Sequence, residues 1–206
     1  MSSTTNPLLE AKGITKYFGT ITALENVNLK VHAGECLGVV GDNGAGKSTL
    51  MKVLSGLYKP SAGSLFFQGK EEILESPRDS QIKELTNAHL DKLKINVKSA
   101  DQKVEELSGG QRQAVAIARS TAFNAKVVIM DEPTAALAIK EVGKVLDLIN
   151  SLKKTGVGVI VISHRMDDIF TVCDRVMALF QGTNFAEASL SNTSRDEVIG
   201  WIMGKK

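Results

Sequence analysis

Continuous apolar runs alternate along this chain with segments that favour helix. The runs at 35–40 (ECLGVV), 126–130 (KVVIM) and 157–162 (VGVIVI) are rich in Val and Ile and are bounded by turn residues. Such runs are typical of parallel strands that are buried on both faces, since helices cover both sides of a parallel sheet. The pattern therefore predicts an α/β fold with a mostly parallel sheet flanked by helices.

The same pattern gives an order of elements for the rest of the chain. We expect strands near 8–17, 22–31, 35–40, 63–69, 126–130 and 157–162, and further strands within 174–188. We expect helices near 47–56, 82–94, 109–123, 139–154, 165–172 and 194–203. The early strands are interpreted as antiparallel and are predicted to form a side sheet.

Composition limits the classes of function. The chain has 206 residues, of which 43% are hydrophobic, which is enough for one sizeable core. A net charge of +2, from 25 basic and 23 acidic residues, describes a mixed surface. We find no basic stripe of the kind that binds nucleic acid, so no nucleic-acid partner is expected.

Nothing in the sequence predicts a membrane span or a secretory leader. No apolar run approaches the roughly 18 residues that a span needs, and the N-terminus lacks a basic segment followed by a long apolar one. Cys36 and Cys173 lie in apolar stretches without metal-ligand spacing, so we expect buried thiols in a reducing compartment. His32 and His89 are interpreted as structural.

A glycine-rich loop follows the expected strand at 35–40. Its sequence GDNGAGKST fits the pattern G-x-x-x-x-G-K-[ST], with Gly41, Gly46, Lys47 and Ser48 at the required positions. Glycines let backbone N–H groups close around an anion, and the following helix directs its positive end at that anion. A simple glycine turn before a helix is the alternative. The loop predicts a phosphate site made of Gly41, Asp42, Asn43, Gly44, Ala45, Gly46, Lys47, Ser48 and Thr49.

Two further strands end in polar residues. Asp131 and Glu132 follow the strand at 126–130, and His164 follows the strand at 157–162. Taken alone, Asp-Glu after a strand is more often a solvated loop. In parallel sheets, however, ligands gather at the carboxyl ends of strands. Beside a phosphate loop, Asp131 is suited to bind Mg²⁺ and Glu132 to accept a proton from an attacking water.

The stretch LSGGQ at 107–111 opens a helix with two glycines, although glycine disfavours helix by roughly 1 kcal/mol relative to alanine. Ser108 and Gln111 fit a capping box, which explains those two residues but not Gly109 and Gly110. Glycines in the first turn leave bare N–H groups on the positive end of the helix, so we interpret this stretch as a second anion site.

Together these motifs carry a family resemblance. GDNGAGKST, LSGGQ, VVIMDEPT and His164 resemble the Walker A, signature, Walker B and switch-histidine elements of ATP-binding cassette (ABC) ATPases, in the same order. The resemblance covers about residues 8 to 188. It implies the P-loop NTPase fold of ABC type, with an antiparallel β side sheet and a shortened helical subdomain. The variant DEPTAAL resembles the ATPases of bacterial simple-sugar importers.

The resemblance also implies a mechanism. ATP is the substrate and Mg²⁺ the cofactor, held by Ser48 and Asp131, while Lys47, Glu132 and His164 act in catalysis. Two copies enclose two ATP molecules head to tail, so that the signature residues face the nucleotide of the partner copy. The signature residues are Leu107, Ser108, Gly109, Gly110 and Gln111. Phe18 is implied to stack on adenine, with Tyr17 as the alternative.

Partners and location follow from the resemblance as well. It implies a homodimer or an equivalent second ATPase subunit, membrane-spanning permease subunits and an external solute-binding protein. The chain would lie in the cytoplasm, on the inner face of the cell membrane. We expect one domain over 1–206, with an antiparallel β and phosphate-loop part at about 1–70, a shortened helical subdomain at about 71–123 and a Walker B part at about 124–206.

The chain departs from the family pattern in two places. Residues 135–138 read AALA, so Ala138 replaces the usual Asp of a turn at the dimer interface. Between Gly69 and Leu107 the family has a longer stretch that includes a glutamine contacting Mg²⁺ and the membrane partner. Gln68, Gln81 and Gln102 do not follow a strand in the expected place. We therefore hypothesise that a segment is missing around Gln81–Ile82.

Three functions remain open at this point. The first is an ATPase subunit that powers a membrane importer, with carbohydrates as the expected cargo. The second is a non-transport ABC ATPase of DNA repair or translation, although such proteins usually carry inserted modules or basic arms. The third is a nucleotide-binding module with impaired hydrolysis. The presence of Lys47, Asp131, Glu132 and His164 favours a working enzyme.

Overall fold

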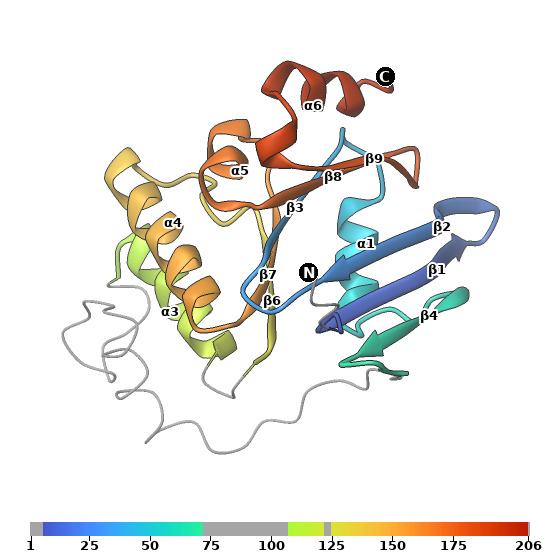
Figure 1. Ribbon diagram of the computed structural model, residues 1–206, viewed down its shortest axis with the longest axis horizontal. Coiled ribbons are helices and arrows are strands. Elements are labelled where there is room, and N and C mark those ends of the chain that lie inside the picture. The colour runs from blue at the N-terminus through green and yellow to red at the C-terminus, as the bar shows by residue number, and fades with distance from the viewer. Residues whose placement is uncertain (1–5, 72–106, 122–124, 206) are drawn as a thin grey trace.

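Two β-sheets and the helices around them make up the computed structural model, which describes residues 6–71, 107–121 and 125–205 (Figure 1). The strands are β1 (Leu9–Phe18), β2 (Ile21–Val31), β3 (Cys36–Val40), β4 (Ala62–Phe67), β5 (Lys70–Glu71), β6 (Val127–Asp131), β7 (Gly158–Ile162), β8 (Arg175–Phe180) and β9 (Thr183–Ser189). The helices are α1 (Lys47–Leu54), α3 (Gly109–Thr121), α4 (Ile139–Lys154), α5 (Met166–Val172), the short 3₁₀ helix η2 (Leu190–Asn192) and α6 (Arg195–Ile202).

The larger sheet has the strand order β6-β7-β3-β8-β9. Its first four strands run parallel, and β9 pairs antiparallel with β8. The mostly parallel sheet predicted from the Val/Ile runs is thus confirmed. Strand β7 lies between β3 and β6, and its last residue Ile162 pairs with both Val39 and Asp131. The carboxyl ends of these three strands therefore lie at one edge of the sheet.

The predicted side sheet is also confirmed. It has the order β2-β1-β4-β5, and every neighbouring pair is antiparallel. Strand β5 was not expected, because its two residues are polar and exposed and carry no hydrophobic pattern. The hairpin of β1 and β2 brings Phe18 and Ile21 to one end of this sheet.

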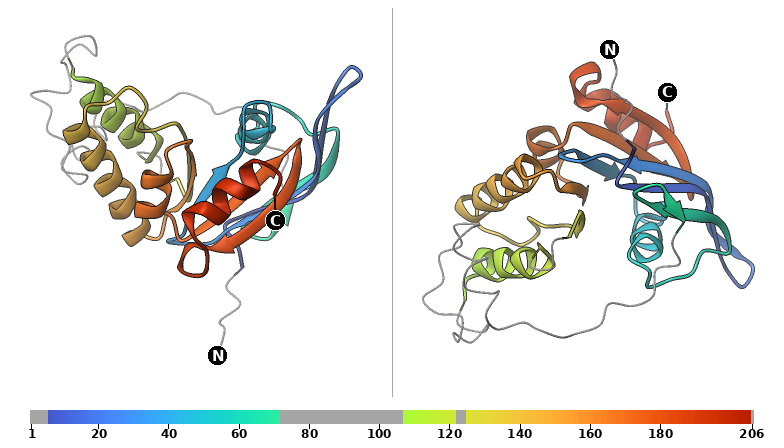
Figure 2. Two further views of the ribbon diagram at one scale, coloured as in Figure 1. Left: turned by 90° about the horizontal axis from the view of Figure 1, so that it is seen from above. Right: turned by 60° about the horizontal axis from the view of Figure 1, so that its bottom comes forward.

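Alternation of side chains along the strands creates two cores, one on each face of the larger sheet. On one face, residues such as Leu37, Ile160 and Met177 pack with α1 and the antiparallel sheet. On the other face, residues such as Val159 and Val176 pack with α4, α5 and α6. Figure 2 shows α1 on the opposite side of the sheet from α3 and α4. Helices on both faces account for strands that are apolar throughout.

Cys36 and Cys173 are both buried and neither forms a disulfide, as predicted. Their Sγ atoms lie 3.4 Å apart, a contact between β3 and the end of α5 that was not predicted from the sequence. The helix expected near 82–94 and the junction at Gln81–Ile82 lie outside the described residues. Among residues 6–71, 107–121 and 125–205, no helix has the length and hydrophobicity needed to cross a lipid bilayer.

Candidate active site

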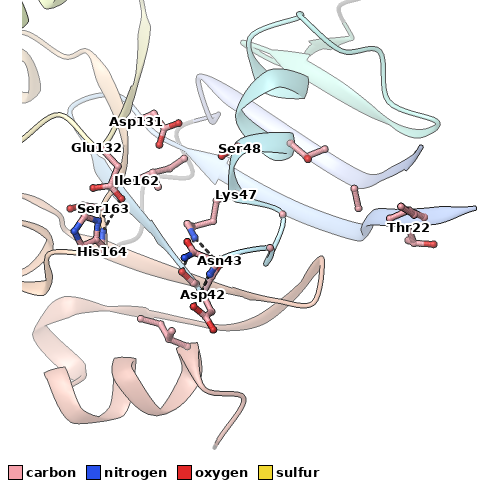
Figure 3. Close-up of a pocket in the computed structure, with 17 residues that line it drawn as sticks. Thr22, Asp42, Asn43, Lys47, Ser48, Asp131, Glu132, Ile162, Ser163 and His164 are labelled. Atoms are coloured by element: carbon pink, nitrogen blue, oxygen red, sulfur yellow. Dashed lines mark hydrogen bonds and ion pairs between the residues drawn. The ribbon is translucent and has the colours of Figure 1, made fainter. Parts of the chain in front are cut away.

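A cleft of about 1000 Å³ opens at the carboxyl edge of the larger sheet (Figure 3). The loop after β3 and the first turn of α1 line it with Gly41, Asp42, Asn43, Gly44, Gly46, Lys47, Ser48 and Thr49. These are eight of the nine residues predicted to bind phosphate. The ninth, Ala45, is buried, and its carbonyl accepts a hydrogen bond from the Gly182 N–H at 3.1 Å.

Two glycines of this loop are required by close approach of the backbone. Gly41 has φ 153° and Gly46 has φ 100°, in the region that disfavours residues with a Cβ. A Cβ at position 41 would lie 2.5 Å from the carbonyl oxygen of Leu179. A Cβ at position 46 would lie 2.8 Å from the carbonyl oxygen of Ala23. Both glycines therefore fit the loop against neighbouring strands as well as leaving its N–H groups bare.

The start of α1 is arranged to receive an anion. Gly46 is the N-cap and offers no side-chain acceptor, and no acidic residue lies in the first turn. Lys47 Nζ donates to the carbonyl oxygens of Gly41 and Asp42 at 2.7 and 2.9 Å. The first N–H groups of a helix need acceptors from outside the helix, and its positive end favours negative charge. A phosphate group in the cleft would satisfy both conditions.

Glu132 and His164 form a pair beside the phosphate loop, at the ends of β6 and β7 (Figure 3). Glu132 Oε1 lies 2.8 Å from His164 Nδ1 and accepts a hydrogen bond from the His164 backbone N–H at 3.1 Å. Glu132 Oε2 is buried and has no hydrogen-bond partner in the structure. Glu132 also has φ 48°, an unusual backbone conformation for a residue with a side chain.

The geometry of this pair suits acid–base chemistry. One carboxylate oxygen contacts His164, and the other is buried without a hydrogen-bond partner. A general base needs an oxygen that can reach the proton it removes, and Glu132 lines the cleft with 29% of its side chain exposed, so its carboxylate suits this role. Asp131 and Ser48 also line the cleft and offer the carboxylate and hydroxyl oxygens that Mg²⁺ prefers. The residues present thus fit a magnesium nucleotide.

The stretch 107–111 does not line this cleft. Its capping box is formed: the Ser108 N–H donates to Gln111 Oε1 at 2.9 Å, and the Gln111 N–H donates to Ser108 Oγ at 3.2 Å. The two anion sites predicted from the sequence therefore do not meet within one copy of the chain.

The structure shows why this stretch contains glycine, a reason that the sequence did not reveal. A Cβ at Gly110 would lie 2.8 Å from the Cβ of Glu141 on α4, so the two helices approach too closely for alanine. The Glu141 carboxylate accepts hydrogen bonds from the Ser108 side chain and the Gly110 backbone N–H, which hold the pKa of Glu141 below its usual range. In this structure the positive end of α3 thus faces a carboxylate of the same chain.

Phe18 does not line the cleft. Its ring packs edge to face on Tyr58 with centroids 5.5 Å apart, and the side of the cleft near this hairpin is lined by Ile21, Thr22 and Ala23 instead. Tyr17 is half exposed and does not line the cleft either. Stacking of either ring on adenine stays a prediction.

Sequence reasoning missed several residues around the site. Ile202 of α6 lines the cleft, and no motif marks this distant helix. Asp168 of α5 is buried and accepts a hydrogen bond from Thr134 Oγ1, two residues after Glu132. An acidic residue in the first turn of a helix is favourable for the helix itself, so its sequence position gave no sign of this contact.

Comparison with known proteins supports the same interpretation. The profile of the ABC transporter family matches residues 24–85 and 71–135, which together make up more than half of the chain. The xylose/arabinose import ATP-binding protein XylG of Sulfolobus acidocaldarius is 38% identical, over 93% of this chain and 92% of that protein. The galactose/methyl galactoside import ATP-binding protein MglA of Escherichia coli O157:H7 is 36% identical over all of this chain, which spans only 49% of its length.

Solved structures show the same fold. An ATP-binding cassette of an ABC transporter in its ADP conformation superposes with a TM-score of 0.85 at 26% identity, over 98% of this chain and all of that one. A dimeric bacterial ABC transporter cassette has a TM-score of 0.74 at 26% identity, over 88% of this chain and 98% of that one. The fold expected from the motifs is therefore confirmed.

The comparisons also bear on the stretch between Gly69 and Leu107, which is shorter than the family pattern. The alignment with MglA spans 250 positions, although this chain has only 206 residues, so more than forty residues of that protein have no counterpart here. The two matched segments of the family profile overlap at 71–85, a range that contains Gln81 and Ile82. The alignment length agrees with the hypothesis of a missing segment but does not locate it, so its place near Gln81–Ile82 stays a prediction.

Proposed function

Because the chain belongs to the ABC transporter family, we propose that it is the ATP-hydrolysing subunit of a membrane importer of carbohydrates. The observation that carries the proposal is the cleft, which gathers the phosphate loop, Asp131, Glu132 and His164 at the ends of three adjacent strands. Each group has the chemistry that nucleotide binding or hydrolysis needs.

ATP binds with its phosphates on the loop 41–46 and the first turn of α1. Lys47 exchanges its two carbonyl partners for phosphate oxygens, which are stronger acceptors because they are charged. Phe18 stacks on the adenine ring, with Tyr17 as the alternative. Ser48 and Asp131 would hold Mg²⁺, which would supply positive charge beside the phosphates.

Glu132 acts as the general base. Its carboxylate accepts a proton from a water molecule as the water oxygen attacks the γ-phosphorus, and the bond from that phosphorus to ADP breaks. His164 contacts Oε1 through its ring and its backbone N–H and thereby fixes the orientation of the carboxylate. His164 is itself largely exposed, with 73% of its side chain accessible, so it can also contact the γ-phosphate.

A second copy of the chain, or an equivalent ATPase subunit, completes the site. Residues 107–111 do not line the cleft of their own chain, and Ser108 among them is exposed, so we place this stretch against the nucleotide of the partner copy. The Glu141 carboxylate at the start of α3 gives way to the γ-phosphate when the copies close. A related bacterial cassette forms a dimer, which supports this arrangement.

The cargo is proposed from the relatives. XylG is named for xylose/arabinose import and MglA for galactose/methyl galactoside import, so a simple sugar is the proposed cargo class. Permease subunits and an external solute-binding protein complete the transporter, with this chain on the inner face of the membrane. Residues 1–206 act as one nucleotide-binding domain, divided at about 70 and 123.

Substitution of the general base tests the proposal. We expect Glu132→Gln to lower kcat for ATP hydrolysis by about 10²- to 10⁴-fold, because the variant cannot accept the proton, while ATP still binds. Phosphate release and ATP affinity are measured side by side, with the exposed Glu25→Gln as the matched control. Equal turnover of Glu132→Gln and the parent chain would remove Glu132 as the base.

The same variant tests the dimer. A slowly hydrolysing chain keeps its ATP, so Glu132→Gln should elute as a dimer in gel filtration with ATP and Mg²⁺ and as a monomer with ADP. A monomer under both conditions would contradict the two-copy mechanism. Co-purification of the intact transporter, followed by sugar uptake measurements, identifies the cargo.

A further inference from the structure

Asp168 is a buried carboxylate on α5 that lies outside the cleft-lining residues. It is 2% exposed and accepts a hydrogen bond from Thr134 Oγ1, which is fully buried. Its second partner is the Arg165 guanidinium, with Nε at 3.4 Å from Asp168 Oδ2. A buried charge is costly without such partners, so the contacts are expected to persist.

The partners of Asp168 connect it to both members of the Glu132–His164 pair. Thr134 follows Glu132 by two residues, and Arg165 follows His164 by one. Asp168 therefore joins the loop after β6 to the loop after β7. The Glu132–His164 contact joins the same two loops on the cleft side.

Glu132 needs support of this kind because of its backbone. Its φ of 48° is costly for a residue with a side chain and persists only where the surroundings fix it. On one side, the Glu132 N–H donates to the carbonyl oxygen of Ile162 at 2.9 Å. On the other side, Thr134 is fixed by Asp168. Loss of the second link would leave the Glu132 backbone free to relax.

We propose that Asp168 is a positioning residue for ATP hydrolysis, which holds the loop of the general base against the loop of His164 through Thr134 and Arg165. The inference rests on the proposed function, because it assigns a role to the support of Glu132. Asp168 does not touch the nucleotide, so its removal should slow the chemical step and leave ATP binding intact.

Variants at both ends of the buried contact test this role. Asp168→Ala and Thr134→Val should each lower kcat by about 10- to 100-fold, since a small displacement of a catalytic group has effects of this size. ATP affinity should change by less than about 2-fold. Thr134→Ser keeps the hydroxyl and should restore turnover. Asp167→Ala is the matched control, because Asp167 is the neighbouring acid but is exposed and pairs with Arg195 instead.

Two combined variants separate positioning from a general loss of stability. Asp168→Ala with Thr134→Val should be no slower than Asp168→Ala alone, because Asp168→Ala already removes the contact that Thr134→Val removes. Asp168→Ala should have no further effect on the residual turnover of Glu132→Gln. A multiplied loss in either combination would overturn the inference, as would normal kcat in both single variants.

A spectroscopic measurement tests, independently of turnover, whether the Thr134–Asp168 contact positions the Glu132–His164 pair. In Thr134→Val, the ring signals of His164 in carbon–proton NMR spectra should shift, because the Glu132 carboxylate no longer lies 2.8 Å from Nδ1. The signals of His32 should stay unchanged. Unchanged His164 signals would overturn the inference. If Glu132→Gln turns over like the parent chain while the His164 signals respond as expected, the assignment of the base fails and the buried link stands.

Discussion

Cys36 and Cys173 show that the properties of a residue, here the pKa of a thiol, depend on a spatial neighbour that its local sequence does not reveal. The apolar context of each predicts a buried thiol, which is correct, but neither context reveals the other. The two Sγ atoms lie 3.4 Å apart. The hydrogen bond with Cys36, together with burial, holds the pKa of the Cys173 thiol well above its ordinary value. Cys173 thus keeps its proton in the folded chain at pH values where the unfolded chain loses it.

Because of this difference, the free energy of unfolding should decrease as pH rises into the alkaline range. The stabilisation is fully present below the unfolded pKa of about 8.5 and is lost as pH rises above it, by up to about 1.4 kcal/mol per pH unit. Urea unfolding under reducing conditions at about pH 8 and about pH 10 measures the loss. Cys173→Ala should lose less stability over this interval. Equal losses in both proteins would show that Cys173 does not cause the dependence.

At the scale of elements, the hydrophobic pattern predicted the larger sheet well because its strands are buried on both faces. A run such as Gly158–Ile162 has no polar position and cannot be mistaken for a surface strand. The strand order was not predicted, since β3 pairs with β7 and β8 far along the chain. The packing of α3 on α4 was missed for the same reason: the contact between Gly110 and Glu141 joins two helices separated by β6.

Two glycines on these helices should respond oppositely to alanine. Gly110→Ala should destabilise the chain by about 1–3 kcal/mol, because the new Cβ would lie 2.8 Å from the Cβ of Glu141 on α4. Gly143→Ala on α4 meets nothing within 4 Å and should stabilise by about 0.5–1 kcal/mol through helix propensity. Chemical unfolding measures both. Stabilisation by Gly110→Ala would contradict the close approach of the helices.

At the scale of the whole molecule, the structure keeps apart the two stretches that we predict to be the halves of a nucleotide site. The sequence predicted both halves, because each is a short motif whose chemistry is local. The motifs alone could not say whether the halves meet within one copy. The structure answers this for a single chain, since none of residues 107–111 lines the cleft.

Mixing two inactive variants tests whether the halves meet between copies. Lys47→Ala damages the phosphate loop and Ser108→Arg blocks the start of α3, so each alone should lack turnover. In an equal mixture, half of the dimers are mixed and each has one intact site, so roughly a quarter of the parent turnover should return. Lys47→Ala and Ser108→Arg combined in one chain, mixed with the Lys47→Ala chain, is the control and should show no turnover, because no dimer in that mixture has an intact phosphate loop beside an intact start of α3. No recovery in the mixture would contradict a site shared by two copies.

The pairing of Ile162 with both Val39 and Asp131 has a consequence for how the site tolerates change. One residue of β7 pairs on one side with the strand end that carries Asp131 and Glu132, and on the other side with the strand that leads into the phosphate loop. A residue inserted into β7 or deleted from it would shift His164 relative to both the acidic pair and the phosphate loop. The length of β7 therefore determines the relative positions of these catalytic groups, and we expect the site to tolerate changes in that length poorly.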